Sequence, residues 1–204
     1  KSLIIDAMKE ATKQIPLRSN SVDPITNETS DGNIGIGLPI IKLSQWDKDY
    51  LNIRLMLKGA GSENVSSQYS LPNHELGAAR DIDGVKKCVL DAVVKAQGRG
   101  CSPGTLGVCI GGTKDSSYEA AKLQIFRKLN DPNPDSKLTE LENDLLEKIN
   151  KLNIGPMGLG GKTTVLAVKA TKQHRHPASF FVSIAYMCWT DRRYEMDYKD
   201  NEWK

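Results

Sequence analysis

The sequence of 204 residues lacks most features that assign a chain at once to a specialised class. Its four cysteines are too few and too scattered for the disulfide framework of a small secreted protein. Lysine and arginine outnumber aspartate and glutamate by only 28 to 25, and this balance is too even to indicate nucleic-acid binding. No apolar run approaches the ~20 residues of a membrane-spanning helix. We therefore expect a cytoplasmic protein with neither a membrane nor a nucleic-acid partner.

Targeting and repetitive segments are also missing from the sequence. It shows no secretory signal, no internal repeat and no low-complexity tract. The chain starts at Lys1, without methionine and directly in a helical pattern, so we expect further residues upstream. The length suffices for one large domain or two small ones.

Hydrophobic periodicity predicts a mixture of helices and strands. We expect helices over 1–15, 81–97, 115–129 and 136–152, and strands over 39–43, 50–57, 106–110, 165–168 and 181–186. The elements lack the regular alternation of a doubly wound sheet, so the predicted fold class is α+β (mixed α/β), with strands flanked by helices. Residues 1–193 are expected to form one domain, with 194–204 as a polar tail or linker.

Two cysteines lie where strand-like segments meet turns. Cys101 stands in Gly100-Cys-Ser-Pro-Gly104, and Cys188 begins Cys188-Trp-Thr-Asp-Arg-Arg193. Such positions can offer soft sulfur ligands to iron. The alternative is that both are small buried hydrophobic residues, the usual role of a free cysteine. Cys88 and Cys109 fall within predicted apolar surfaces, and we expect both to be buried.

Three other segments have a functional and a structural interpretation. The loop from Pro156 to Thr163 is glycine-rich, but a phosphate-binding loop needs glycine at its first position and a preceding strand. Arg18 is either solvent-exposed or a bidentate partner of a carboxylate. His176 either belongs to a solvated turn or handles a proton near a substrate. The turn Lys58–Asn64 contains Gly59 and Gly61, which let backbone amides approach a ligand.

Five segments, in this order, resemble the α subunit or N-terminal domain of class I fumarate hydratases and of the related L-tartrate dehydratases. They are Leu17-Arg-Ser-Asn-Ser-Val22, Lys58-Gly-Ala-Gly-Ser-Glu-Asn64, Cys101-Ser-Pro103 with Gly111-Gly112, Ile154-Gly-Pro-Met-Gly-Leu-Gly-Gly161, and Arg175-His-Pro-Ala-Ser179 with Cys188–Arg193. Together they span nearly the whole chain.

The resemblance implies a hydro-lyase that reversibly adds water to fumarate with a 4Fe-4S cluster as Lewis acid. On this sequence, Cys101 and Cys188 would be cluster ligands, and Arg18, Gly59, Gly61 and His176 would contact the dicarboxylate, His176 also acting in catalysis. A β subunit or C-terminal domain would complete the enzyme, which is expected to be oligomeric.

The sequence departs from the family pattern at two places. The cysteine of a Cys-Gln-Asp-Thr-Gly motif is absent, so the third cluster ligand is expected upstream of Lys1. Ala60 replaces a common glycine, which requires a negative φ there. Three alternatives remain open: an L-tartrate dehydratase α subunit, a cluster-free relative without catalysis, and a nucleotide-binding protein. The form of the loop Lys58–Asn64 favours fumarate over tartrate.

Overall fold

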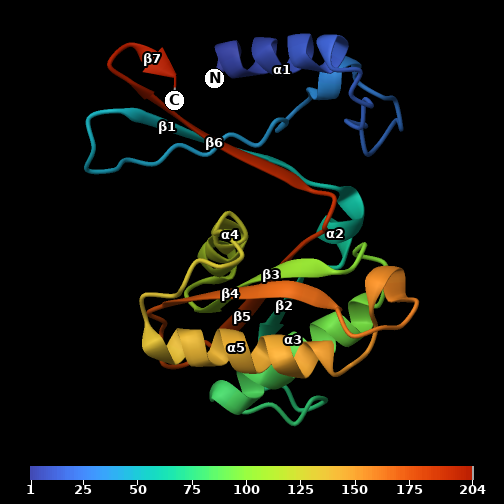
Figure 1. Ribbon diagram of the computed structural model, residues 1–204, viewed down its shortest axis with the longest axis vertical. Coiled ribbons are helices and arrows are strands. Elements are labelled where there is room, and N and C mark those ends of the chain that lie inside the picture. The colour runs from blue at the N-terminus through green and yellow to red at the C-terminus, as the bar shows by residue number, and fades with distance from the viewer. Residues whose placement is uncertain (204) are drawn as a thin grey trace. The chain divides into compact units, whose positions relative to one another are not determined.

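The computed structural model describes residues 1–203, and the chain divides into two compact units, Lys1–Tyr50 and Leu51–Lys204 (Figure 1). It combines helices with parallel and antiparallel strand pairs, which confirms the predicted α+β class. None of the helices within residues 1–203 is long and apolar enough to cross a membrane.

The first unit is built on one helix, α1 (Ser2–Gln14), as its apolar spacing predicts. The helix ends before Pro16, whose ring cannot continue it. Thr12 is buried, and its hydroxyl donates to the carbonyl of Gly32 at 3.2 Å. This contact ties α1 to the 3-10 helix η1 (Asp31–Asn33).

The strand predicted over residues 39–43 is wrong. This described segment has no strand, and Leu43 is 80% exposed. Pro39 lacks an N–H group, and no strand of the first unit lies beside the segment to complete a ladder. An apolar run without a pairing partner does not form a strand.

The helices of the second unit begin at well-defined caps. The Asp81 carboxylate accepts from the amide of Gly84, and Asp135 accepts from the amides of Lys137 and Leu138. Ala60 opens the short helix with a helical backbone, so its φ is negative as required. The helices are α2 (Ala60–Asn64), α3 (Ile82–Ala96), α4 (Lys114–Gln124), α5 (Ser136–Asn150) and the 3-10 helix η2 (Pro156–Gly158).

The strands of the second unit form two sheets. The larger has the order β2-β5-β3-β4, in which β3 and β4 are parallel and the other pairs antiparallel. The smaller has the order β1-β6-β7 and is antiparallel throughout. The strands are β1 (Leu51–Leu57), β2 (Ser67–Ser70), β3 (Gly104–Gly111), β4 (Val165–Gln173), β5 (Phe181–Met187), β6 (Arg192–Lys199) and β7 (Glu202–Trp203).

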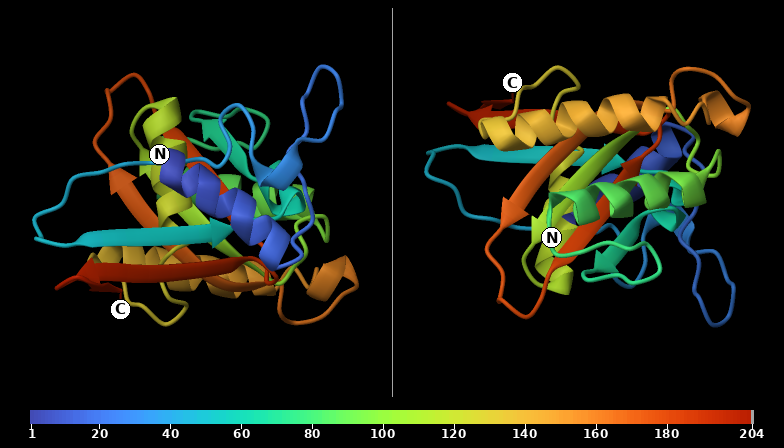
Figure 2. Two further views of the ribbon diagram at one scale, coloured as in Figure 1. Left: turned by 90° about the horizontal axis from the view of Figure 1, so that it is seen from above. Right: turned by 90° about the horizontal axis from the view of Figure 1, so that it is seen from below.

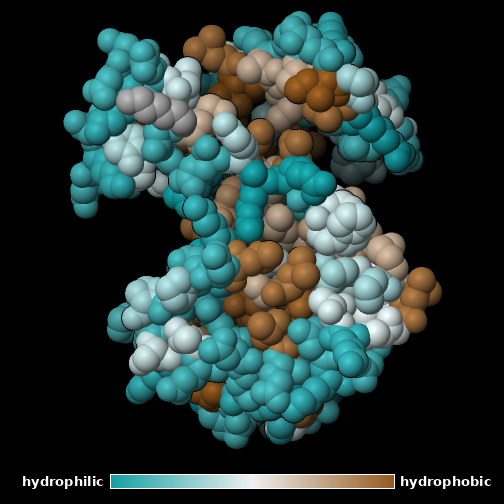
Figure 3. All heavy atoms as spheres, viewed as in Figure 1, coloured by the Kyte–Doolittle hydropathy of each residue, from teal (hydrophilic) through white to brown (hydrophobic). Residues whose placement is uncertain are grey.

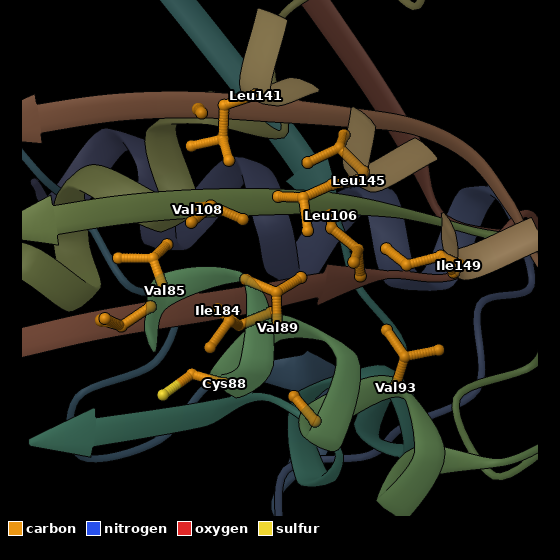
Figure 4. Close-up of a cluster of buried hydrophobic side chains, with 14 of the residues drawn as sticks. Val85, Cys88, Val89, Val93, Leu106, Val108, Leu141, Leu145, Ile149 and Ile184 are labelled. Carbon is orange, nitrogen blue, oxygen red and sulfur yellow. The ribbon is translucent and has the colours of Figure 1, made fainter. Parts of the chain in front are cut away.

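Helices cover both faces of the larger sheet. Helices α3 and α5 lie on one face, where they are seen in front of the strands in the right panel of Figure 2, and α4 lies on the other. The main core gathers side chains from α3, α5, β3 and β5, including Val89, Leu145 and Leu106 (Figure 4). The outward side of α5 is hydrophilic (Figure 3), in keeping with its amphipathic pattern. Burial of β3 on both faces explains its uninterrupted apolar run.

The segment from Tyr194 differs from the polar tail or linker that we expected. It lies within β6, which pairs with the whole of β1 from Leu51 opposite Tyr198 to Leu57 opposite Arg192. Tyr194, Met196 and Tyr198 alternate with charged residues, which is the period of a strand. The charged residues lie on the opposite face of the strand from these three. Because the segment contains so many charged residues, the alternation typical of a strand was not recognised in the sequence.

Candidate functional site

Cys101 and Cys188, which are far apart in sequence, meet at one end of the larger sheet. Strands β3 and β5 are antiparallel, and Thr105 lies opposite Met187. The turn that precedes β3 therefore faces the turn that follows β5. The Sγ atom of Cys188 donates to the backbone carbonyl of Cys101 at 3.5 Å, and both cysteines are free thiols. The structure thus brings two soft donors together.

The Cys101 turn is held by the glycine-rich loop from Gly155 to Gly161. Cys101 itself has a φ of 55°, a left-handed conformation uncommon for a residue with a side chain. The buried hydroxyl of Ser102 donates to the carbonyl of Gly155 at 2.6 Å, and the amide of Met157 donates to the carbonyl of Ser102 at 2.9 Å. These contacts fix the direction of Cys101.

The same loop lacks the surroundings of a phosphate-binding loop. It follows helix α5, whereas a phosphate-binding loop follows a strand. The amide of Met157 is used by Ser102, and that of Gly155 donates to the Thr164 hydroxyl at 3.1 Å. The loop therefore supports the cysteine turn, and nucleotide binding gains no support.

Asp191 organises the turn around Cys188. One carboxylate oxygen accepts from the amide of Cys188 at 2.9 Å and from the hydroxyl of Ser62 at 3.1 Å. The other accepts from the amide of Gly59 at 2.8 Å. This buried carboxylate joins the Cys188 turn to the start of α2, so the segments 58–64 and 188–191 form one structure.

The electrostatic surroundings favour the protonated form of Cys101. Burial raises the pKa of its thiol, and the neighbouring Cys188 thiol and Asp191 carboxylate raise it further. A bound metal cation reverses this preference because it interacts with the thiolate. Lys58 lies nearby and bonds to Glu63 at 2.8 Å, while burial lowers the pKa of its ammonium group.

Tyr186 lies behind the two cysteines. It is 2% exposed and belongs to the main core. A Cβ atom added at Gly104 would come within 2.7 Å of its hydroxyl oxygen, and one added at Gly100 within 2.8 Å of its ring. The glycines on either side of Cys101 therefore leave the room that this ring occupies. Burial, and then the charges of the Cys188 and Cys101 thiols, raise the pKa of the Tyr186 hydroxyl.

Cys88 and Cys109 are buried as predicted and lie away from this site. Cys88 is in α3, where burial and then the charge of Asp91 raise the pKa of its thiol to about 11. Cys109 packs with Ala120 and Ala121 of α4 on the opposite face of the sheet. Neither thiol can join Cys101 without unfolding the core.

Gly59, Gly61 and Arg18 were predicted to contact a substrate, and the structure places them in different surroundings. The amide of Gly59 is used by Asp191, and Gly61 packs in α2 against the carbonyl of Arg99, so Gly59 offers no free amide. Arg18 is exposed in the first unit, and its carbonyl accepts from the Asn20 side chain.

His176 is not beside the cysteine pair within one chain. It follows the end of β4, where Gln173 lies opposite Gly111. Cys101 precedes the other end of β3, and the eight residues of that strand span about 23 Å at ~3.3 Å per step. The Nδ1 atom of His176 accepts from the amide of Ala178, and the Arg175 guanidinium holds the carbonyls of the same turn.

Asp191 and Tyr186 were not predicted from the sequence. Asp191 stands three residues after Cys188, a spacing at which a carboxylate can accept from the cysteine amide. That spacing is a usable local signal for Asp191. Tyr186 offers no such signal, because its proximity to Cys101 depends on the pairing of β3 with β5.

The donor set at the sheet end fits part of an iron–sulfur site. Two thiols meet there, and sulfur is the ligand atom that iron–sulfur groups take. Within residues 1–203, no group of three or more histidine, cysteine, aspartate or glutamate side chains is arranged to hold a metal ion. The described residues thus bring two sulfur atoms together at this place.

Comparisons with known proteins identify the family of this chain. A family model described as fumarate hydratase (Fumerase) matches residues 1–197. The chain is 53% identical over 196 residues to a Geobacillus stearothermophilus protein named "Putative fumarate hydratase class I", covering 95% of this chain and 38% of that protein.

Two further relatives are named as α subunits. The chain is 39% identical over 193 residues to a Methanocaldococcus jannaschii protein named "Putative L(+)-tartrate dehydratase subunit alpha", covering 93% of this chain and 66% of that protein. It is 30% identical over 198 residues to the Escherichia coli L(+)-tartrate dehydratase subunit alpha, covering 94% and 62%. The chain spans less than two thirds of the length of each of these three relatives. Because the family model extends along nearly the whole chain, this protein belongs to the fumarate hydratase family.

Proposed function

We propose that this chain is the α-type part of a cytoplasmic hydro-lyase that interconverts fumarate and (S)-malate. The observation that carries the proposal is the convergence of Cys101 and Cys188 at one sheet end, within a family of hydratases. The two α-subunit relatives support a β subunit or C-terminal domain as the partner. The greater identity to the relative named as a fumarate hydratase favours fumarate, and L-tartrate is the alternative substrate.

In this proposal Cys101 and Cys188 hold a 4Fe-4S cluster, with a third cysteine from a part of the protein outside this sequence. When bound with one iron open, such a cluster supplies a Lewis acid for the substrate hydroxyl and carboxylate. The chain's own contribution is to present both sulfur atoms from rigid turns. The amide of Thr190 donates to the Sγ atom of Cys188 at 3.4 Å, and this contact helps to hold the sulfur atom in place.

The other expected site residues are proposed to contact the substrate. The exposed guanidinium of Arg18 suits a dicarboxylate, because its fork matches two carboxylate oxygens. Gly59 and Gly61 form part of the wall of the substrate site. The Gly59 amide does not donate to the substrate, because it donates to the carboxylate of Asp191. His176 lies about 23 Å along β3 from the cysteine end, so it can contact substrate at that cluster only from another copy of the chain.

The test uses the full-length protein with its β part, reconstituted anaerobically with iron and sulfide. We expect malate dehydration, followed by ultraviolet absorbance, to rise in proportion to cluster content and to exceed L-tartrate dehydration. Cys101→Ala and Cys188→Ala should lose both cluster and activity. Arg18→Ala should keep the cluster and raise KM for malate about thirtyfold or more, since a lost charged contact costs ~2 kcal/mol or more.

Matched variants separate these roles from general damage. Cys109→Ala removes a buried thiol from the opposite face of the sheet and should keep the cluster. Lys13→Ala removes an exposed cation of α1 and should leave KM unchanged. Full cluster loading in Cys101→Ala or Cys188→Ala would reject the ligand assignment, and a preference for L-tartrate would identify the alternative substrate. Absence of both cluster and activity from the wild-type protein would favour a relative without catalysis.

A further inference from the structure

The side chains of Cys101 and Cys188 are in direct contact although neither belongs to a disulfide. The Sγ atom of Cys188 lies 3.5 Å from the backbone oxygen of Cys101, and both cysteines are free thiols. The two thiols also interact with each other through a side-chain hydrogen bond. Both belong to turns that follow from the pairing of β3 with β5, so the contact is a property of the fold.

The two cysteines differ in their access to solvent. Cys101 is partly exposed, whereas Cys188 is buried at 4% exposure. A small oxidant dissolved in water therefore reaches Cys101 first, and Cys188 lies directly beside it. An accessible thiol next to a second, resolving thiol is the usual arrangement of a redox-sensitive cysteine pair.

The other two cysteines of the chain do not compete for this reaction. Cys88 and Cys109 are both completely buried, and they pack in separate core clusters on opposite faces of the larger sheet. Neither thiol meets solvent, and neither reaches Cys101 while the core is folded. Within residues 1–203, the intact fold therefore brings together one pair of cysteines, Cys101 and Cys188.

We propose that Cys101 and Cys188 are a site of reversible covalent modification, at which a peroxide joins them in a disulfide when no iron group holds them. The Cys101 sulfur attacks a peroxide oxygen, the O–O bond breaks, and a sulfenic acid and one water molecule form. The Cys188 sulfur then attacks the Cys101 sulfur, the S–O bond breaks, and the hydroxyl leaves with the thiol proton as a second water molecule. Two thiols are thereby oxidised to one disulfide, and one peroxide is reduced to two molecules of water.

The disulfide has a direct consequence for metal binding. Metals are bound by the thiolate form of cysteine, and neither sulfur of a disulfide is a thiolate. The oxidised pair therefore cannot hold iron until a thiol cleaves the bond by thiol–disulfide exchange. The reaction itself needs no cluster, so it goes beyond the proposed function and precedes cluster assembly.

The test treats the full-length protein with its β part, stripped of iron by a chelator, with a small excess of hydrogen peroxide. Because the raised pKa of the Cys101 thiol slows its attack, the incubation is long. The remaining thiols are then alkylated as the protein unfolds, and tryptic peptides are identified by mass spectrometry without reduction. We expect the peptide that begins after Arg99 to be linked to the peptide that contains Cys188, and dithiothreitol to separate the two.

Cys109→Ala is the matched control, because Cys101 and Cys109 both lie between Arg99 and Lys114 and so share one tryptic peptide. This variant should keep the linkage, and Cys101→Ala should lose it. Unfolding the wild type in urea before the peroxide is added should give mixed linkages that include Cys88 and Cys109, because the fold no longer selects the pair.

Two results with the folded wild type would overturn the inference. One is linkage of Cys101 to a cysteine other than Cys188. The other is oxidation of Cys101 that stops at the sulfenic or sulfinic acid, with Cys188 recovered in its alkylated form. Failure of the reduced wild type to assemble a cluster would reject the proposed function alone, because the disulfide does not depend on it.

Discussion

Asp191 carries more of the site's architecture than any residue selected from the sequence. Its carboxylate accepts hydrogen bonds from Gly59, Ser62 and Cys188, which lie on two segments far apart in the chain. If the carboxylate were removed, the buried amide of Cys188 would lose its partner, whereas the Ser62 hydroxyl would keep the carbonyl of Gly59 at 2.8 Å. The position of Cys188 therefore depends on a residue that is not itself a ligand in the proposal.

We expect Asp191→Ala to lower the free energy of unfolding by about 1–3 kcal/mol, because it leaves the buried amide of Cys188 unpaired. Urea denaturation of the cluster-free protein measures this loss. Asp83→Ala is a suitable control, since Asp83 is exposed in the first turn of α3 and its helix-dipole contribution is at most about 1 kcal/mol. Equal losses in the two variants would show that the Asp191 contacts contribute nothing specific.

Residue types and local spacing predicted part of the site. They selected Cys101 and Cys188 from four cysteines, and burial of Cys88 and Cys109 followed from their apolar neighbours. They could not predict the Tyr186 hydroxyl, which is unpaired within residues 1–203, because its surroundings depend on the pairing of β3 with β5. The two cysteines that these strands bring together are 87 residues apart in the chain. The family resemblance implied a substrate role for His176, and strand direction places this residue beyond the other end of β3 from Cys101.

At the scale of elements, Glu142 links α5 to β4. Its Oε1 atom accepts from the Arg127 guanidinium at 2.8 Å, from Asn133 at 2.7 Å and from the amide of Ala170 at 2.7 Å. The side chain is buried, so this carboxylate joins a helix, a strand and the connection that precedes the helix. Apolar packing alone would leave the position of α5 along the sheet less well determined.

Removal of this carboxylate should cost about 1–3 kcal/mol, because the buried amide of Ala170 would lose its acceptor, while Arg127 would keep its ion pair with Asp131 at 3.0 Å. We expect Glu142→Ala to unfold at a correspondingly lower urea concentration, with the loss read from equilibrium denaturation. Glu140→Ala changes an exposed position of the same helix and should stay within about 0.5 kcal/mol of the wild type. A loss below 1 kcal/mol in Glu142→Ala would contradict this role.

Periodicity predicted most elements because each has a clear apolar pattern and a stop signal. The helix at 136–150 has inward leucines and the cap at Asp135, and both are readable in the sequence. The strand predicted at 39–43 did not form, because a strand needs a partner as well as apolar residues. Strand β6 was missed for the opposite reason, since its charged residues obscured an alternation that β1 completes.

At the scale of the whole molecule, the chain divides after Tyr50 into two compact units. The described residues 39–50 contain neither helix nor strand, and Leu43 and Ile40 are exposed. Such segments are the preferred sites of proteolytic cleavage. The division could not be predicted from composition, because no Pro- or Ser-rich linker marks it.

Brief digestion of the cluster-free protein with trypsin should therefore cut first after Lys42 or Lys48. The second unit has its own buried core, so a fragment beginning near residue 49 should persist, and mass spectrometry of the early products identifies it. Replacing both lysines with glutamine should slow that first cut. Early cleavage inside α3 or α5 instead would contradict the division.

The pairing of Gly59 with Asp191 also sets an order of events during synthesis. The Asp191 carboxylate, which accepts from the Gly59 amide, is synthesised 132 residues later. Synthesis of these residues takes about 7–26 s at ~5–20 residues per second on the ribosome. Cys101 leaves the ribosome before Cys188 by 87 residues and so spends that interval without its neighbour. A nascent chain therefore cannot present Cys101 and Cys188 together until β5 and the turn after it have been made, and iron delivered earlier could not meet this pair.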